Sequence, residues 1–210
     1  GYDPSSNLKW QVDAEGERLC FTYDEAGRIL QKLDGGSGTG ECIGNNYPVL
    51  AQYTYDGDGS DMSELGRLLQ VESGQPSDIG HTLTTFTYDY RGRTTQISRQ
   101  IDGRIYEMQT EFDAMNRPDK LIYPTDDELL MTYDQQGANT LVTKQGAVST
   151  PLVDWIAYDI RGQMTALRRA NGIRTDYLYG GADESYRLIV ANTPDVHQFE
   201  YEYDAIGNIT

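Results

Sequence analysis

The sequence is poor in the residues from which most enzymes build an active site. It contains 2 histidines and 2 cysteines in 210 residues, and no nucleophile, zinc-ligand or phosphate-binding motif includes them. His81 and His197 both lie near turn signals, so we interpret them as ordinary loop residues. The glycine-rich run from Gly35 to Gly40 lacks a following Lys-Ser/Thr and a helix, so it predicts a flexible loop. We expect no enzyme and no cofactor.

Long apolar runs and a leader pattern are absent as well. No segment approaches the ~18 apolar residues of a membrane-spanning helix, and the first residues do not form a signal peptide. Cys20 and Cys42 have no metal-ligand spacing, and two cysteines do not make a disulfide scaffold. The spacing leaves open whether they are bonded. The sequence therefore does not establish a compartment.

Positive charge is scarce. The chain has 33 acidic and 17 basic residues and a formal net charge of −16. Such a surface repels phosphate backbones and anionic lipid, so we expect no nucleic-acid partner. The excess charge keeps a strand-rich protein soluble, or it matches a basic partner.

Tyrosine and glycine are plentiful, although apolar residues make up only 38% of the chain. There are 16 Tyr and 22 Gly, spread along the whole length. A disordered chain would be poor in aromatic residues. This composition predicts many short strands joined by many turns.

A short unit, Tyr-Asp-x-x-Gly-Arg with a second aromatic or apolar residue two positions before the Tyr, recurs throughout the chain. Internal repeats of this kind determine the whole fold. Two copies are degenerate, with Phe and Asn in one and a long insert in the other, and the aromatic pair at Tyr177 and Tyr179 lacks the Asp. The repeat positions are Tyr23, Asp24, Gly27, Arg28; Tyr55, Asp56, Gly66, Arg67; Tyr88, Asp89, Gly92, Arg93; Phe112, Asp113, Asn116, Arg117; Tyr133, Asp134, Gly137; Tyr158, Asp159, Gly162; Tyr203, Asp204, Gly207.

Each part of the unit has a mechanical reason. Residues two apart lie on one face of a strand. Asp at the first position and Gly at the fourth suit a type I turn, and Gly takes a positive φ at little cost. Asn116 stands where Gly is expected, and Asn is the usual substitute in that region. We therefore expect positive φ at these glycines and at Asn116.

A second family of turns lies between the repeats. Asp-Gly and Asn-Gly pairs between apolar runs are strong hairpin signals. These turns are at Asp102-Gly103, Thr125 to Glu128, Gln145-Gly146, Asn171-Gly172 and Asn192 to Asp195. The fold class that follows is all-β: an antiparallel β-hairpin meander, with no helix longer than about two turns.

The array is less regular at its start. We assign residues 1–85 to an irregular start with loop inserts at about 34–48 and 56–64, and residues 86–210 to a regular β array continuous with it.

Acidic clusters offer two further interpretations. Asp56, Asp58 and Ser60 resemble the first positions of a calcium loop, but Arg67 stands where a bidentate Glu is needed, so a solvated loop is preferred and no metal is expected. Carboxylates at Asp126, Asp127 and Glu128 could suggest glycosidase chemistry, but Asp is favoured in such turns for local hydrogen bonds.

The repeats resemble the YD repeats of bacterial RHS proteins and of the B/C components of Tc toxin complexes, and more distantly those of teneurins. The stretches from Arg168 to Tyr179 and from Tyr203 to Thr210 carry the bacterial likeness most clearly. The resemblance implies a sheet that curves or spirals into a hollow β-shell enclosing a C-terminal effector or toxin. This chain would then be a non-catalytic structural segment of that shell, secreted or at a cell surface. Its partners would be the rest of the shell and an encapsulated effector.

An alternative stays open: an adhesion module that binds glycans or a cell-surface partner through a Tyr-rich sheet face. Stacking of sugars and cross-strand packing both use such a face.

The last strand carries a further expectation. The sequence stops at Thr210, soon after the final turn, so the strand around Phe199 to Tyr203 would present unpaired backbone groups. Exposed strand edges pair with other edges. We expect self-association through terminal strands, or disorder at both ends.

Overall fold

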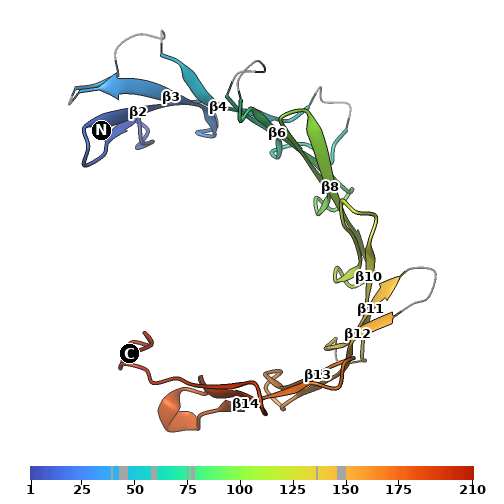
Figure 1. Ribbon diagram of the computed structural model, residues 1–210. Coiled ribbons are helices and arrows are strands. Elements are labelled where there is room, and N and C mark those ends of the chain that lie inside the picture. Colours follow the sequence, from blue (N-terminus) through green and yellow to red (C-terminus); the bar gives the residue numbers. More distant parts are fainter. Residues whose placement is uncertain are drawn as a thin grey trace. The chain divides into compact units, whose positions relative to one another are not determined.

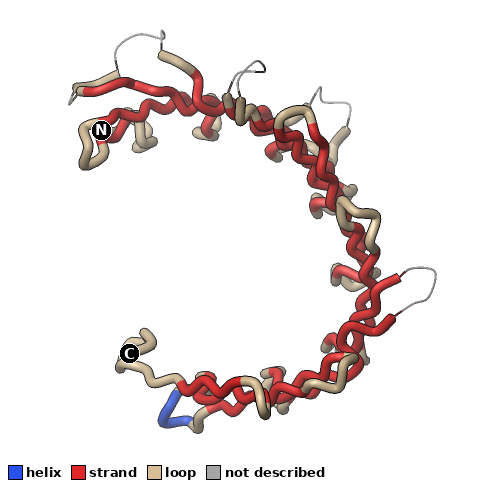
Figure 2. The backbone as a smooth tube through the Cα atoms, viewed as in Figure 1, coloured by secondary structure: helices blue, strands red, loops and turns tan. Residues whose placement is uncertain are grey.

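The computed structural model describes residues 1–38, 40–42, 47–57, 61–74, 76, 79–135, 137–145 and 150–210 (Figure 1). Its sixteen strands form one antiparallel sheet in which hydrogen-bonded neighbours follow the chain order from β1 to β16. Within this described part, the only helical segment is η1, a 3-10 turn at Ala182–Glu184 (Figure 2). The predicted all-β antiparallel meander is confirmed.

The chain divides into two compact units, Gly1–Gln109 and Thr110–Thr210, and β8 crosses the division. The first unit holds β1 Trp10–Val12, β2 Glu17–Tyr23, β3 Ile29–Ser37, β4 Val49–Tyr55, β5 Leu68–Ser73, β6 Thr82–Tyr88, β7 Thr94–Ile101 and most of β8 Arg104–Phe112. The second unit holds β9 Pro118–Ile122, β10 Glu128–Tyr133, β11 Asn139–Gln145, β12 Thr150–Tyr158, β13 Met164–Arg169, β14 Arg174–Tyr179, β15 Leu188–Thr193 and β16 His197–Glu200.

The strand register gives the sheet two unlike faces. Residues paired across antiparallel strands point to the same face. In the first unit one face, here called the apolar face, carries the row Phe86–Ile97–Met108. The opposite face carries polar rows such as Thr87–Gln96–Gln109. In the second unit the apolar face carries the rows Met131–Val142–Val153, Ile156–Leu167–Thr175 and Tyr177–Ala191–Phe199.

Neither unit has a conventional core. Among the described residues the buried apolar ones are small or medium in size: Cys20, Leu33, Ala51, Ala166 and Ala191. Within that set no large side chain is fully buried, and Ile97 and Met108 on the apolar face remain more than a third exposed. A single sheet needs a second layer to bury its apolar face, so contacts within the sheet must hold the strands together.

A β-bulge precedes the repeat tyrosine in hairpin after hairpin. In β6 and β7, Thr87 pairs with Gln96 but Tyr88 pairs with Thr94, so one residue of the return strand is unpaired. The same shift occurs at Tyr23, Tyr55, Tyr133, Tyr158 and Tyr179. A bulge bends the strand and re-aims a side chain.

The first insert begins later than the sequence predicts. Strand β3 continues through Gly35 and Gly36 to Ser37 instead of ending near residue 34. The reason is contact: a Cβ at Gly35 would lie 2.7 Å from the Cys20 sulfur and 2.8 Å from Arg18 Nε, so only glycine lets β2 approach. Cys20 and Cys42 form a disulfide, which resolves the pairing that the spacing left open.

The prediction of a boundary near residue 85 concerns regularity of the repeats and stays a prediction. The second insert begins at Asp56 as expected, but residues 58–60 lie outside the described residues, as does Gly146 of the Gln145-Gly146 turn.

Candidate functional site: the repeat junction

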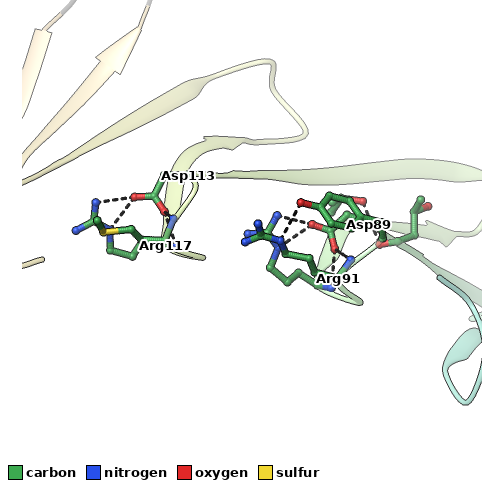
Figure 3. Close-up of polar contacts among 9 residues, drawn as sticks. Asp89, Arg91, Asp113 and Arg117 are labelled. Carbon is green, nitrogen blue, oxygen red and sulfur yellow. Dashed lines mark hydrogen bonds and ion pairs between the residues drawn. The ribbon is translucent and has the colours of Figure 1, made fainter.

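The Asp of each repeat organises a five-residue turn. In the turn from Asp89 to Arg93, Asp89 N donates to Arg93 O at 3.0 Å and Gly92 N donates to Asp89 O at 2.8 Å. One carboxylate oxygen accepts from the backbone N–H of Arg91 at 2.9 Å and of Arg93 at 3.0 Å. Figure 3 shows this carboxylate and its equivalent at Asp113. The turn therefore satisfies its own backbone donors without a neighbouring strand.

The same turn recurs along the chain. Its defining bonds, from the Asp N–H to the carbonyl of the closing residue and from the fourth residue back to the Asp carbonyl, are present at Asp24, Asp89, Asp113, Asp134, Asp159 and Asp204. At Asp56 the turn is longer, but Asp56 N still donates to Arg67 O at 3.2 Å.

The predicted backbone conformation at the fourth position is confirmed. Gly27, Gly92, Gly137, Gly162 and Gly207 have φ of 76°, 78°, 89°, 79° and 99°. Asn116 takes their place with φ of 67°, and Gly66 closes the longer turn with φ of 77°. Only glycine enters this region without a steric penalty.

The arginine that closes a turn folds back onto the aspartate that opens it. Arg93 Nε lies 2.7 Å from Asp89 Oδ2, and Arg28 Nε and Arg117 Nε lie 2.7 Å from the matching oxygens of Asp24 and Asp113. Hydrogen bonds from the Arg93 side chain hold the pKa of Asp89 below its usual 3.8. The pKa values of Asp24 and Asp113 are also lowered, first by the backbone N–H of the closing arginine.

The tyrosine links each hairpin to the one before it. Tyr88 Oη donates to Leu68 O at 2.7 Å, and Leu68 is the residue after the preceding turn. The matching bonds join Tyr23 to Leu8 O, Tyr133 to Pro118 O, Tyr179 to Met164 O and Tyr203 to Leu188 O, at 2.6 to 3.0 Å. Burial raises the pKa of Tyr23, Tyr88 and Tyr179.

The closing arginine covers the next tyrosine. The guanidinium carbon lies 4.6 Å from the Tyr55 ring centre for Arg28, and 5.6, 4.2 and 5.3 Å away for the pairs Arg67–Tyr88, Arg117–Tyr133 and Arg187–Tyr203. A cation over an aromatic face is attracted by the ring quadrupole. Arg28 also forms an ion pair with Asp56, 2.5 Å away. Asp, Arg and the following Tyr thus form one repeat junction.

The sequence did not predict two features of the junctions. Asp3 to Asn7 forms the same turn, with Asp3 N to Asn7 O at 2.9 Å and Ser6 at φ 68° in the glycine position. After Tyr179, Gly180 N donates to Arg187 O at 2.8 Å, so an insert holding η1 replaces the short turn. In the first case the sequence does contain the pair Tyr2-Asp3. The turn was not predicted because Ser6 stands where the repeat has glycine.

The remaining candidates have local roles. Asp56, proposed for a cation, pairs with Arg28 and accepts from Gly66 N, while Asp58 and Ser60 lie outside the described residues. Asp127 pairs with Lys144 at 2.7 Å in the predicted hairpin turn. No cluster of three metal-ligating side chains occurs within the described part of the chain.

The histidines occupy different surroundings. His81 Nε2 lies 2.9 Å from Glu72 Oε1, and His197 Nε2 lies 3.3 Å from Thr193 Oγ1. The described part of the chain contains no helix long and apolar enough to cross a bilayer.

Comparisons with known proteins place this fold. No family model matches the chain. The chain is 26% identical over 214 residues to the double-stranded DNA deaminase toxin A of Burkholderia cenocepacia, covering 96% of this chain and 14% of that protein.

Solved toxin-complex structures share the fold. The crystal structure of TcdB2-TccC3 matches with a TM-score of 0.62 and 18% identity over 96% of this chain and 12% of that one. The Photorhabdus luminescens Tc holotoxin pore matches with a TM-score of 0.60 and 18% identity over 98% of this chain and 12% of that one. The chain thus spans a small part of each relative. These likenesses confirm, for the fold, the resemblance to the RHS-repeat components of toxin complexes.

Proposed function

We propose that this chain is a non-catalytic wall segment of a β-shell that encloses an effector carried by the same protein. The observation that carries the proposal is the match of 96% of this chain to 12% of TcdB2-TccC3. A repeat array that matches one small stretch of a much larger assembly is suited to continue into neighbouring repeats.

The sheet itself supports a wall. Repeat junctions, and not a buried core, hold its strands together. The array can therefore extend without a second layer. The described part of the apolar face is left partly exposed, and an enclosed polypeptide would supply the missing apolar contacts. One neighbour, TcdB2-TccC3, is also described without its hypervariable C-terminal region, which fits an effector that varies while the wall stays constant.

The deaminase name of the curated relative does not extend to this segment. Nucleobase deaminases hold zinc with a His-x-Glu and a Pro-Cys-x-x-Cys motif. Here His81 is followed by Thr82 and Leu83, His197 by Gln198 and Phe199. Both cysteines are joined in a disulfide. We therefore assign any such activity to another part of a complete protein.

Glycan binding through the tyrosine face remains the second candidate. It is disfavoured because several repeat tyrosines already donate their hydroxyls to backbone carbonyls and lie under an arginine, as Tyr88, Tyr133 and Tyr203 do. A ring face covered by a guanidinium is not available for stacking with a sugar.

A protease-protection experiment on the complete natural protein tests the proposal. Gly162→Val places a β-branched residue at φ 79° and should open the wall locally, exposing the downstream domain to protease. Gly181→Val is the matched control, because Gly181 has φ −76° and nothing within 4 Å of an added Cβ. Equal protease sensitivity of the downstream domain in the parent and in both variants would overturn the wall function.

A further inference from the structure

The first repeat junction lacks the arginine that lies over the following tyrosine at Tyr55, Tyr88, Tyr133 and Tyr203. The turn from Asp3 to Asn7 closes with Asn7, whose side-chain nitrogen bends back to Asp3 Oδ2 at 3.0 Å. Among the described residues no arginine lies over the next ring, Tyr23. The Tyr23 hydroxyl still donates to Leu8 O at 2.8 Å, so the hairpins are joined in the usual way.

The other junctions show where the absent side chain would lie. The guanidinium groups of Arg67, Arg117 and Arg187 lie beside the glycine of the following turn as well as over the tyrosine ring. A Cβ on Gly137 would lie 3.3 Å from Arg117 Nη1, and one on Gly207 would lie 2.9 Å from Arg187 Nη2. At Gly27, the equivalent glycine, the nearest atom is instead Asn7 Oδ1 at 3.5 Å.

An open cavity occupies this place. It has a volume of about 490 Å³, and its lining includes Asp3, Asn7, Phe21, Tyr23, Asp24 and Gly27. Of these, Asp3, Tyr23 and Asp24 are the counterparts of the groups around Arg28, which lies 2.7 Å from Asp24, 2.5 Å from Asp56 and 4.6 Å from the Tyr55 ring centre. Lys9, which also lines the cavity, is paired with Glu41.

We propose that this cavity binds a guanidinium group, supplied by an arginine side chain of a partner polypeptide. The aromatic face of Tyr23 and the carboxylate of Asp3 provide the cation–π contact and the charge that the built-in arginines receive elsewhere, and Asp24, which already pairs with Arg28, adds a second carboxylate. A planar guanidinium fits the site better than the compact ammonium of lysine. The net charge of −16 favours approach of a basic segment. This site is independent of the proposed wall function.

The test uses NMR of tyrosine-labelled protein titrated with N-acetyl-arginine methylamide. The Tyr23 ring resonances should shift with concentration, whereas those of Tyr88, already under Arg67, should shift far less. The lysine analogue should act weakly. Equal responses at Tyr23 and Tyr88, or no response at either, would overturn the proposal.

A variant that supplies the missing group gives the second measurement. Asn7→Arg should reduce the Tyr23 response to the probe by about tenfold or more, because the built-in guanidinium acts at high effective concentration. Asn208→Arg is the matched control: it adds the same charge at an equivalent turn and leaves the Tyr23 site unchanged. An unaltered response in Asn7→Arg would contradict the assignment.

Agmatine distinguishes the source of the guanidinium. Tighter binding of the capped arginine than of agmatine supports a side chain of a polypeptide. Tighter binding of agmatine supports the guanidinium site but overturns the polypeptide as its source, since the acidic cavity would then hold the free amine as well.

Discussion

At the scale of single residues, one aspartate carboxylate accepts hydrogen bonds from backbone N–H groups of the turn that have no partner on a neighbouring strand. Asp89 accepts from two backbone N–H groups and from the Arg93 guanidinium. The side chain that closes the turn then covers the next tyrosine where it is arginine, as Arg67 covers Tyr88. A repeat with few buried side chains therefore depends on polar contacts more than a globular domain does.

The tyrosine hydroxyl can be tested by Tyr133→Phe. This change removes the bond to Pro118 O, 2.6 Å away, and keeps the ring under Arg117. We expect a loss of about 1 kcal/mol in the free energy of unfolding, measured by urea titration. Tyr2→Phe, at a ring 72% exposed, should cost almost nothing. Equal effects of the two changes would show that the hydroxyl bond contributes nothing.

Acid should weaken the turns. The folded-state pKa values of Asp24, Asp89, Asp113 and Asp204 lie below the ordinary value of 3.8. A depressed pKa contributes stability above the unfolded pKa, and this contribution is lost as the pH falls through the folded value. The urea midpoint should therefore hold steady from about pH 7 to about pH 5 and fall below about pH 4.

A variant assigns this acid dependence to one turn. Asp89→Asn keeps an acceptor for the backbone N–H groups but cannot titrate, so the fall in the midpoint below pH 4 should be smaller than in the parent. A midpoint that rises on acidification, or an unchanged slope in the variant, would contradict the ion-pair assignment.

At the scale of elements, the hairpins were predictable and their mutual attachment was not. Asp and Gly at fixed offsets determine a turn locally, so Asp89 and Gly92 located the hairpin from the sequence. The bulge at Tyr88 lies within the β6–β7 hairpin, but the contact of Arg67 with Tyr88 depends on the register between hairpins, which no local pattern encodes. The turn at Asp3 was not predicted because Ser6 adopts the positive φ that glycine adopts in most of the other repeat turns.

The disulfide should stabilise the strands next to it and not the distant ones. Cys20 lies in β2, and Cys42 lies beyond β3 in the insert, which Arg18 also holds through Gly40 O, 3.0 Å from its Nη1. Cys42→Ser should speed amide hydrogen exchange in β2 to β4 and leave β13 to β15 unchanged, because a repeat array contacts mainly its neighbours. Faster exchange throughout both units would instead show that the array unfolds as one cooperative body.

At the scale of the whole molecule, the two units share one construction. Both are built from antiparallel hairpins with an apolar and a polar face, and both rely on the same junctions, as at Arg28–Tyr55 and Arg117–Tyr133. This uniformity fits a wall, in which every segment performs the same task, better than an enzyme, which concentrates its chemistry at one place. The expected self-association of terminal strands stays a prediction that light scattering of the isolated segment can check.

Cryo-electron microscopy of the complete natural protein distinguishes a wall segment from a separate domain. We predict that this segment continues at both outer strands into further antiparallel hairpins, with its apolar face turned toward an enclosed space that holds density for a downstream domain. A segment that stands outside any shell as a separate domain, with its apolar face toward solvent or a surface partner, would contradict it.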